Sequence, residues 1–198
     1  MTDFEKTESS PPSHAALPYA PRNRWKPDVI RQGDAIVKDY GRRSLLVRAF
    51  GRLCLRWEEA ALRRLEGIEG IPAFLGRPTP DSLKMGAVPG EPLAKRKRGE
   101  LSEAFLRNLA TLFDLMHQRG VAHGDAHKRN ILADGERPYL VDFSTAYVRG
   151  RLPLLDEYVF RCFVSLDLER LYKVEKSLFG TGNPPKMFLL YRLIKGLK

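Results

Sequence analysis

The sequence predicts an α+β fold in which short antiparallel strands and one long helix precede a mainly helical region. Two apolar runs near residue 30 are short enough to be strands, and two later stretches place apolar residues three and four positions apart, as in an amphipathic helix. A further short apolar run follows the second of these helices. The 198 residues are 43% hydrophobic and 29% charged, which is typical of a globular domain.

The order of these patterns divides the chain into three parts. Residues 1–23 are rich in Ser, Pro and Glu and have little to bury, so a mobile tail is expected there. An N-terminal lobe that holds the strands and the long helix is expected at 24–91, and a helical C-terminal lobe at 92–198. A chain of this length is expected to form one domain, or two lobes that share a core.

The first two expected elements are a hairpin and a helix. Two apolar runs in residues 28–39 are separated by Gln32-Gly33-Asp34, where the glycine suits a tight turn. A helix is then predicted from Ser44, a favourable N-cap, to Glu66, with Gly51 as a point at which it could divide. Its apolar residues include Trp57, and neither Trp57 nor Trp25 needs a role beyond core packing.

Strands, a second helix and a helical end are expected after residue 70. Residues 71–93 contain short apolar runs broken by Pro and Gly, which favours strands joined by tight turns. The helix at 102–119 has one apolar face and stops before Gly120. A strand is predicted at 138–143 and helical structure from about residue 155.

Composition and charge limit the partners and the compartment. The chain has 34 Lys and Arg against 24 Asp and Glu, a net charge of +10 that favours anionic partners. No stretch is long and apolar enough for a membrane span, and no signal-like apolar segment opens the sequence. Cys54 and Cys162 lie in apolar stretches and are expected in the core, in a reduced, cytoplasmic protein. The basic, amphipathic residues 187–198 leave peripheral contact with an anionic membrane open.

The segment 121–143, VAHGDAHKRNILADGERPYLVDF, carries the candidate chemistry. Asp125 and Asn130 follow a helix that ends at Gly120, and Asp142 follows an apolar strand. A carboxylate and an amide oxygen suit Mg²⁺, and a second carboxylate can accept the proton of a hydroxyl group. Transfer of a phosphoryl group from ATP requires these three roles. The sequence therefore predicts that these three side chains together supply metal ligands and a base.

The same segment resembles the kinase-like phosphotransferases. HGDAHKRN is similar to their catalytic loop in the H-G-D-x-H-x-x-N form of aminoglycoside and choline kinases, and VDFS is similar to the D-F-G motif. The resemblance covers about residues 28–175. It is closest to small bacterial kinases grouped with lipopolysaccharide core (heptose/Kdo) kinases, and the chain also resembles the RIO kinases. The resemblance implies a minimal two-lobed protein-kinase-like fold, with ATP and Mg²⁺ as cofactors. It also implies that Asp125 is the catalytic base and that Asn130 and Asp142 are the metal ligands.

The resemblance also assigns residues outside the loop. Lys38, in AIVKDY, matches the lysine that contacts the α- and β-phosphates. Its expected partner is Glu58, with the adjacent Glu59 as the alternative, because neighbouring residues of a helix cannot both face inward. The hinge that holds adenine is expected from Met85 to Val88. His127 stands where protein kinases usually carry a lysine that contacts the γ-phosphate.

Four departures limit the resemblance. No G-x-G-x-x-G precedes Lys38, where the hairpin offers only Gly33, and Ser144 replaces the D-F-G glycine. Gly124 replaces the arginine of H-R-D, and no A-P-E follows. These losses argue against a regulated protein kinase of the eukaryotic type.

The functional expectation is therefore ATP- and Mg²⁺-dependent phosphorylation of a hydroxyl group. The expected acceptor is a small molecule or glycolipid, above all a sugar of the lipopolysaccharide core, or a protein Ser or Thr. The alternative is a pseudokinase that binds a nucleotide or a partner without transfer. Nucleic acid is not expected as a partner, because aromatic and basic residues do not alternate along a strand. A zinc site at His123, Asp125 and His127 is disfavoured, because the chain offers few other histidines.

Overall fold

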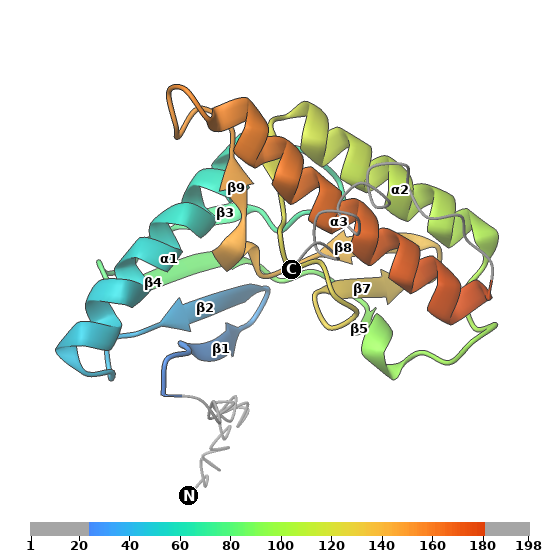
Figure 1. Ribbon diagram of the computed structural model, residues 1–198. Helices are drawn as coiled ribbons and strands as arrows, with labels where there is room; N and C mark the ends of the chain where they lie inside the picture. Colours follow the sequence, from blue (N-terminus) through green and yellow to red (C-terminus); the bar gives the residue numbers. More distant parts are fainter. Residues whose placement is uncertain (1–23, 181–198) are drawn as a thin grey trace, which may run out of the picture.

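The computed structural model describes residues 24–180, and Figure 1 shows their arrangement. A four-stranded antiparallel sheet and helix α1, which spans Leu45–Arg64, form the part on the left of the figure. Helices α2, Glu103–Gln118, and α3, Asp156–Phe179, form most of the part on the right. The expected α+β fold is confirmed.

The N-terminal sheet has the strand order β1-β2-β4-β3. Its strands are β1 (Asp28–Gln32), β2 (Ala35–Asp39), β3 (Phe74–Gly76) and β4 (Ser82–Gly86). The β1–β2 hairpin is the predicted one, and Gly33 takes a φ of 58° in its turn. Since β2 lies between β1 and β4, Lys38 is on an inner strand of this sheet, opposite Leu83.

Short strands connect the larger helices in the rest of the chain. The elements are β5 (Glu91–Pro92), the 3-10 turn Leu93–Lys95, β6 (Val121–Ala122), β7 (Ile131–Asp134), β8 (Arg137–Leu140), the 3-10 turn Phe143–Thr145 and β9 (Tyr147–Val148). They form the sheets β5-β7-β8 and β6-β9. Strand β8 ends at Leu140, earlier than predicted, so Asp142 lies in the bend after the strand.

One continuous hydrophobic core joins these parts. It includes Leu62 of α1, Leu83 of β4, Phe113 of α2, Leu140 of β8 and Val174 of α3. The predicted lobe boundary at residues 91 and 92 falls within β5, which pairs with β7. The division into lobes stays a prediction, and the expected tail at 1–23 and the basic segment 187–198 lie outside the described residues.

Three sequence expectations about side chains were wrong. Cys162 is exposed, whereas Cys54 is buried as expected. Trp25 and Trp57 are not core residues, because 55% and 36% of their surfaces are exposed. For Trp57 the physical reason is that α1 packs through one face only, whereas its apolar residues cover more than that face. None of the described helices is long and apolar enough to cross a membrane.

Gly51 does not divide α1, which continues unbroken from Leu45 to Arg64. A Cβ atom built at Gly51 would lie 2.4 Å from the ring of Tyr40, so the glycine allows this ring to pack against the helix. Ser44 occupies the N-cap position as expected, but its side chain makes no capping hydrogen bond.

Replacing Gly51 with alanine is therefore expected to lower the free energy of unfolding. The helix-propensity gain of about 1 kcal/mol is outweighed by an overpacking cost of about 1–3 kcal/mol. Urea denaturation measures the difference, and Ala49→Gly, at an exposed position of the same helix, isolates the propensity effect. A stabilised Gly51→Ala variant would contradict the close contact with Tyr40.

Candidate active site

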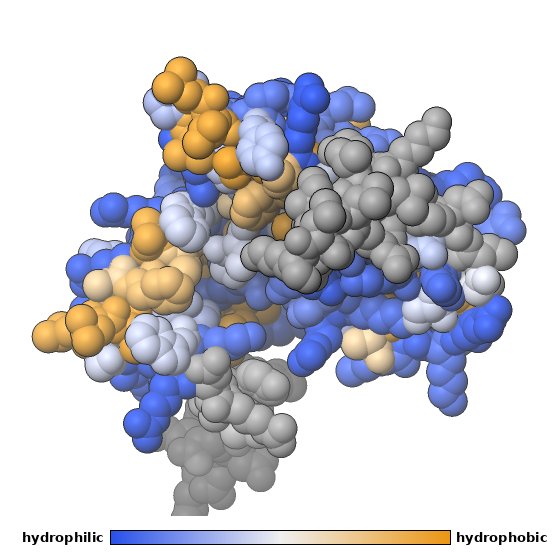
Figure 2. Space-filling model, in the orientation of Figure 1, coloured by the Kyte–Doolittle hydropathy of each residue, from blue (hydrophilic) through white to orange (hydrophobic). Residues whose placement is uncertain are grey.

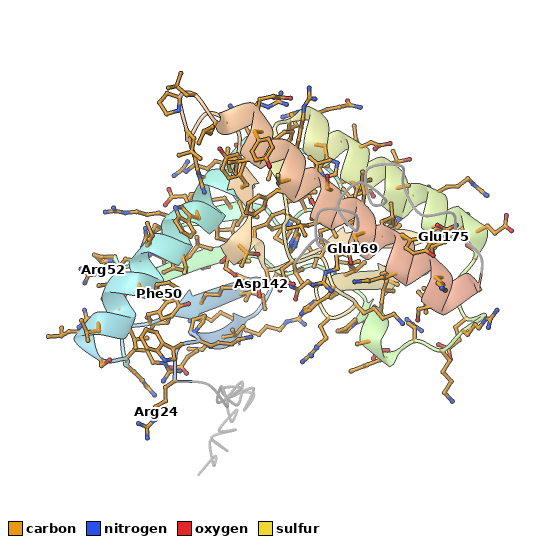
Figure 3. The ribbon with its side chains drawn as sticks, in the orientation of Figure 1. Arg24, Phe50, Arg52, Asp142, Glu169 and Glu175 are labelled. Atoms are coloured by element: carbon orange, nitrogen blue, oxygen red, sulfur yellow. The ribbon has the colours of Figure 1, made fainter. Side chains whose placement is uncertain are left out.

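Lys38 of β2 is the centre of a buried ionic cluster. Its ammonium group donates to both oxygens of Glu58 on α1, at 2.7 and 2.9 Å, and to Asp142 Oδ1 at 2.8 Å. Glu58 and Lys38 are both buried. Asp142 lies near the middle of the molecule, between α1, which carries Phe50 and Arg52, and α3, which carries Glu169 and Glu175 (Figure 3).

The expectation that Glu58 faces inward is confirmed by these contacts, and Glu59 faces another way. Glu59 accepts a hydrogen bond from Arg63 at 2.9 Å and lies 3.7 Å from Arg77. Strand β2 and helix α1 thus bring together Lys38 and Glu58, which lie 20 residues apart in sequence.

The ionic cluster shifts the pKa values of Lys38 and Asp142 so that both groups stay charged. Burial acts to lower the pKa of Lys38, but the adjacent carboxylates of Glu58 and Asp142 raise that pKa above its ordinary value. Burial acts to raise the pKa of Asp142, but Lys38, helped by the hydroxyl group of Ser144, holds that pKa well below its ordinary value. Lys38 is therefore a cation and Asp142 an anion throughout the neutral pH range.

Exchanging Glu58 for glutamine is expected to weaken both the fold and the binding of nucleotide. The change leaves the Lys38 ammonium group with one buried charged partner fewer, which typically costs about 3–5 kcal/mol for a buried pair. Thermal unfolding and nucleotide affinity provide the measurements. Glu59→Gln is the matched control, and equal effects of the two changes would contradict the inward orientation of Glu58 alone.

The backbone turns sharply at Asp142. This residue has a φ of 67° and a ψ of 70°, in the left-handed region that non-glycine residues rarely adopt. The turn directs Phe143 into the core, and its N–H group donates to Glu58 Oε1 at 3.1 Å. Ser144, in place of the D-F-G glycine, donates from its hydroxyl group to Asp142 Oδ1 at 2.8 Å. The departure at Ser144 therefore adds a hydrogen bond that holds the Asp142 carboxylate.

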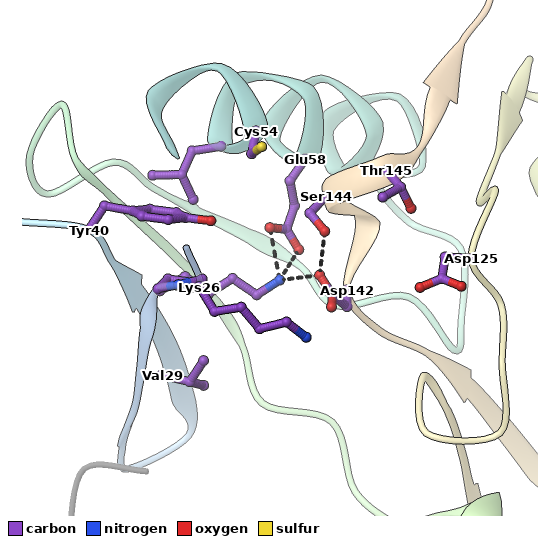
Figure 4. Close-up of a pocket in the computed structure, with 12 residues that line it drawn as sticks. Lys26, Val29, Tyr40, Cys54, Glu58, Asp125, Asp142, Ser144 and Thr145 are labelled. Atoms are coloured by element: carbon purple, nitrogen blue, oxygen red, sulfur yellow. Dashed lines mark hydrogen bonds and ion pairs between the residues drawn. The ribbon is translucent and has the colours of Figure 1, made fainter. Parts of the chain in front are cut away.

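Asp125 and Asn130 lie in the loop between β6 and β7. The Asn130 side-chain amide donates to the Asp125 carbonyl at 2.9 Å, and the Asn130 carbonyl accepts from the Val141 N–H at 2.9 Å. These two hydrogen bonds place Asn130 between the chain segments that carry Asp125 and Asp142. Figure 4 shows Asp125 across from the group formed by Glu58, Ser144 and Asp142. A cavity of about 390 Å³ is lined by both aspartates and by Lys38.

The donor set fits a divalent ion of the Mg²⁺ type. The Asn130 amide is fixed through its nitrogen, which leaves its oxygen available as an acceptor. Among the described residues, the hydrogen bonds to the Asp142 carboxylate engage Oδ1 and leave Oδ2 open. Among residues 24–180, no group of three His, Cys, Asp or Glu side chains is placed to hold a metal. A Mg²⁺ ion here would therefore complete its coordination with phosphate oxygens and water, as it usually does.

His123 is a structural residue of the loop. It is fully buried, and its Nδ1 accepts from the Asp125 N–H at 3.4 Å while Nε2 donates to the Val141 carbonyl at 3.0 Å. Its ring packs on Phe143, with the ring centroids 4.7 Å apart. His123 thereby links the segment of Asp125 to the segment of Asp142.

Asp167 of α3 is a site residue that sequence reasoning missed. It is fully buried, and its carboxylate accepts from the backbone N–H groups of His123 at 2.7 Å and Gly124 at 2.8 Å. It also lies 3.0 Å from Nε2 of His117. The available signal was an aspartate in register with the apolar residues of α3, because Asp167 lies seven residues after the buried Phe160 and seven before the buried Val174.

Gly124 is required because α3 packs closely against this part of the loop. Its φ is 75°, and a Cβ atom there would lie 2.8 Å from the ring of Phe163 on α3. An arginine at this position, as in H-R-D, would not fit without a shift of α3. Helix α3 therefore fixes the two residues that precede Asp125.

Basic side chains of α3 and of the loop lie near Asp125. Arg170 of α3 lies 3.8 Å from Asp125 Oδ1, and His127 lies 3.9 Å from Oδ2. Lys128 is directed to α3 instead, where its ammonium group donates to Ser177. Nδ1 of His127 is buried and has no hydrogen-bond partner among the described residues. Arg170 is thus a second site residue that motif reasoning did not reach.

The predicted hinge lines an apolar cavity of about 310 Å³ beside Lys38. Met85 and Val88 both face this cavity, as do Ile36, Leu132 and Val141. The N–H groups of Gly86 and Ala87 already donate to the carbonyls of Ala73 and Asp34 at 2.8 Å. Lys38 and Asp142 line both cavities, so an apolar slot adjoins the charged site.

This fold and this cluster define a protein-kinase-like phosphotransferase. A sequence model of the phosphotransferase enzyme family matches residues 33–149, more than half of the chain. The chain therefore belongs to that family. The matched range contains Lys38, Glu58, Asp125, Asn130 and Asp142.

Solved structures share the fold. The Rio2 kinase from Chaetomium thermophilum superimposes with a TM-score of 0.63 at 15% identity, over 81% of this chain and 56% of that one. The structure of a Rio2 kinase–ADP/Mg²⁺–phosphoaspartate complex from the same organism gives a TM-score of 0.57 at 16% identity, over 81% of this chain and 55% of that one.

Curated relatives match over a shorter stretch. Probable bifunctional tRNA threonylcarbamoyladenosine biosynthesis proteins of Methanosarcina barkeri (strain Fusaro / DSM 804) and Methanosarcina acetivorans are 42% and 40% identical to the chain over 65 residues. This stretch is 33% of the chain and 11% of each relative, so the chain spans a small part of their length.

Proposed function

We propose that the protein transfers the γ-phosphoryl group of ATP to a hydroxyl group, with Mg²⁺ as the metal. The observation that carries the proposal is the convergence of Lys38, Asp125, Asn130 and Asp142 on one site next to an apolar slot. Family membership and the Rio2 kinase bound to ADP and Mg²⁺ support the same choice of nucleotide and metal.

Each residue has a distinct role in this proposal. The slot at Met85 and Val88 takes the adenine ring, and Lys38, held by Glu58, binds the phosphates. Asn130 and the free oxygen of Asp142 hold Mg²⁺, which supplies positive charge to the transferring phosphoryl group. Asp125 orients the acceptor hydroxyl group and takes its proton. His127, which lies 3.9 Å from Asp125, contacts the γ-phosphate in this proposal.

ATP turnover tests this function. Purified protein is incubated with ATP and a panel of acceptors, with Mg²⁺ or with a chelator, and Asp142→Ala is compared with wild type. We expect transfer that requires Mg²⁺ and falls at least about a hundredfold in Asp142→Ala, the size typical of an electrostatic contribution of this kind. Turnover that persists in Asp142→Ala or in the presence of the chelator would refute the assignment.

The second candidate is a pseudokinase that binds nucleotide without transfer. The β1–β2 turn favours it, because Gly33 is its only glycine and no glycine-rich loop covers the phosphates. Thermal-shift titration followed by a phosphorylation assay separates the two candidates. Stabilisation by ATP that depends on Mg²⁺, together with transfer to an acceptor, supports the enzyme. Stabilisation without transfer to any acceptor supports the pseudokinase.

The acceptor in this proposal carries negative charge close to its hydroxyl group. Arg170 lies beside Asp125, and a small adjoining hollow is lined by His127, Lys128, Arg170, Lys173 and Val174, with no acidic residue among them. Such a surface favours an anionic sugar of the lipopolysaccharide core over an ordinary Ser or Thr peptide.

Arg170→Ala is expected to raise KM for an anionic sugar acceptor roughly tenfold, the usual size for one charge-assisted contact. KM for ATP is expected to stay unchanged, because Arg170 lies on the acceptor side of Asp125. Steady-state kinetics with each substrate varied in turn give both values. Lys176→Ala, an exposed change on the same helix, is the control. An equal rise of both KM values would argue against an acceptor role.

A further inference from the structure

The outer face of α1 exposes a row of large apolar side chains. Leu46, Phe50, Leu53 and Trp57 follow one another at spacings of four, three and four residues, so they lie on one side of the helix. Leu46 is 80% exposed, and the other three are between 36% and 48% exposed. These four residues are called the apolar ridge. A solvent-facing helix side is normally polar, so a row of this kind indicates a contact surface.

A second apolar group protrudes next to the ridge. The segment that precedes α3, Leu152-Pro153-Leu154-Leu155, exposes all three of its leucines, and Leu154 is 96% exposed. These four residues are called the leucine loop. Tyr158, in the first turn of α3, is 69% exposed and continues this group.

The apolar ridge and the leucine loop lie on the same side of the molecule. The guanidinium group of Arg151, directly before the loop, lies 5.6 Å from the centre of the Trp57 ring. Figure 2 shows the apolar residues of α1 at the left and of the leucine loop at the top of one face. Trp25 packs edge-on against Phe50 and adds to the ridge.

Arginines border this apolar surface. Arg56 of α1, directly before Trp57 in sequence, is exposed at the border of the ridge. Arg48 and Arg52 lie farther round the helix and share the carboxylate of Asp81. Arg151 directly precedes the leucine loop, whereas Arg149 is paired with Glu157 at 2.8 Å.

We propose that the apolar ridge and the leucine loop dock the protein on an anionic lipid bilayer. Exposed leucine and tryptophan side chains enter the interface, and the bordering arginines meet the lipid phosphates. The bordering arginines favour an anionic bilayer over a second copy of the chain. A symmetric contact through this face would bring the arginines of two copies together. This surface lies within the described residues and is separate from the segment 187–198.

The proposed docking brings the bilayer close to the candidate active site. Cys54 and Leu55 of α1 line the cavity that contains Lys38 and Asp125. The helix that contacts the bilayer therefore also forms a wall of the active site. This geometry suits an acceptor that resides in the membrane, a point that rests on the proposed function, whereas the docking itself does not.

Vesicle binding tests the docking without any assay of activity. The full chain is sedimented with vesicles of phosphatidylcholine alone or of phosphatidylcholine with phosphatidylglycerol. We expect binding to the anionic vesicles and a loss of at least about tenfold in Leu46→Glu and in Leu154→Glu, because each change removes one leucine from the interface. Leu75→Glu and Leu115→Glu, at exposed leucines of β3 and α2, are the matched controls and are expected to bind as wild type.

Tryptophan fluorescence gives an independent readout. The chain has two tryptophans, Trp25 and Trp57, and both lie on the proposed surface, so binding is expected to shift their emission to shorter wavelength. Unchanged binding in Leu46→Glu and Leu154→Glu, or no emission shift on binding, would overturn the proposal, as would absence of binding. A concentration-dependent dimer that Leu46→Glu dissociates would assign the surface to a second copy instead. Failure of ATP turnover would leave these results unaffected.

Discussion

Replacing Asp125 with alanine is expected to abolish most phosphotransfer while the protein stays folded. General-base catalysis contributes roughly 10²–10⁴-fold, so kcat is expected to fall by at least a hundredfold. The Asp125 side chain is 41% exposed, and its ionic neighbours within residues 24–180, Arg170 and His127, are distant, so its removal disturbs little packing. KM for ATP is expected to change little, since the nucleotide contacts come from other residues.

Single-turnover transfer measures the loss of phosphotransfer, and thermal unfolding measures whether the variant stays folded. Asp114→Ala, at an exposed aspartate of α2, serves as the control for loss of an acidic residue. A variant with near wild-type turnover would show that Asp125 is not the base, and a large loss of stability would make the activity result uninformative about chemistry. Asp125→Asn, which keeps the shape of the side chain, then decides the question.

The largest expected loss of stability comes from Asp167→Asn. The wild-type carboxylate accepts hydrogen bonds from two backbone N–H groups and lies within hydrogen-bond distance of the His117 ring, all without access to water. The amide can accept through one atom only, and its NH₂ group would face a donor. Since each unsatisfied buried group costs about 1–3 kcal/mol, a loss of about 3 kcal/mol in the free energy of unfolding is expected.

Urea denaturation and thermal unfolding both report this change. A loss of about 3 kcal/mol corresponds to a fall in Tm of roughly 6–12 °C for a domain of this size. Asp114→Asn is the matched control and is expected to shift Tm very little. Wild-type stability of Asp167→Asn would mean that Asp167 does not hold the loop at His123 and Gly124. Reduced kcat beyond the loss of folded protein is also expected, because these residues position Asp125.

Local patterns were sufficient for the larger elements and for the centre of the site, but they did not predict the short strands β6, β7 and β9. The bounds of α1 and α2 and the β1–β2 hairpin follow from apolar spacing and from Gly33, since each depends on neighbours close in sequence. The loop motif identified Asp125, Asn130 and Asp142 together, because a short loop and a hairpin hold all three. The roles proposed for them stay predictions until the variants are measured.

Long-range packing explains what the patterns missed. Asp167 lies 44 residues from His123 in sequence, and no local rule indicates that a helical aspartate will cap a distant loop. Apolar spacing on α1 likewise did not show which apolar residues would find a partner. Leu62 is buried in the core, whereas Leu46 lies in solvent, although both fit the same helical repeat.

The sequence by itself determined the larger elements, their order and the chemical groups of the candidate site, because these depend on local backbone preference and on side-chain identity. Only the tertiary structure decided that Glu58 and not Glu59 meets Lys38, that Asp167 and Arg170 of α3 reach the catalytic loop, and that one side of α1 stays uncovered. Those outcomes depend on which faces of distant elements meet when the core closes, and the free energy of that closure is shared among residues far apart in the chain.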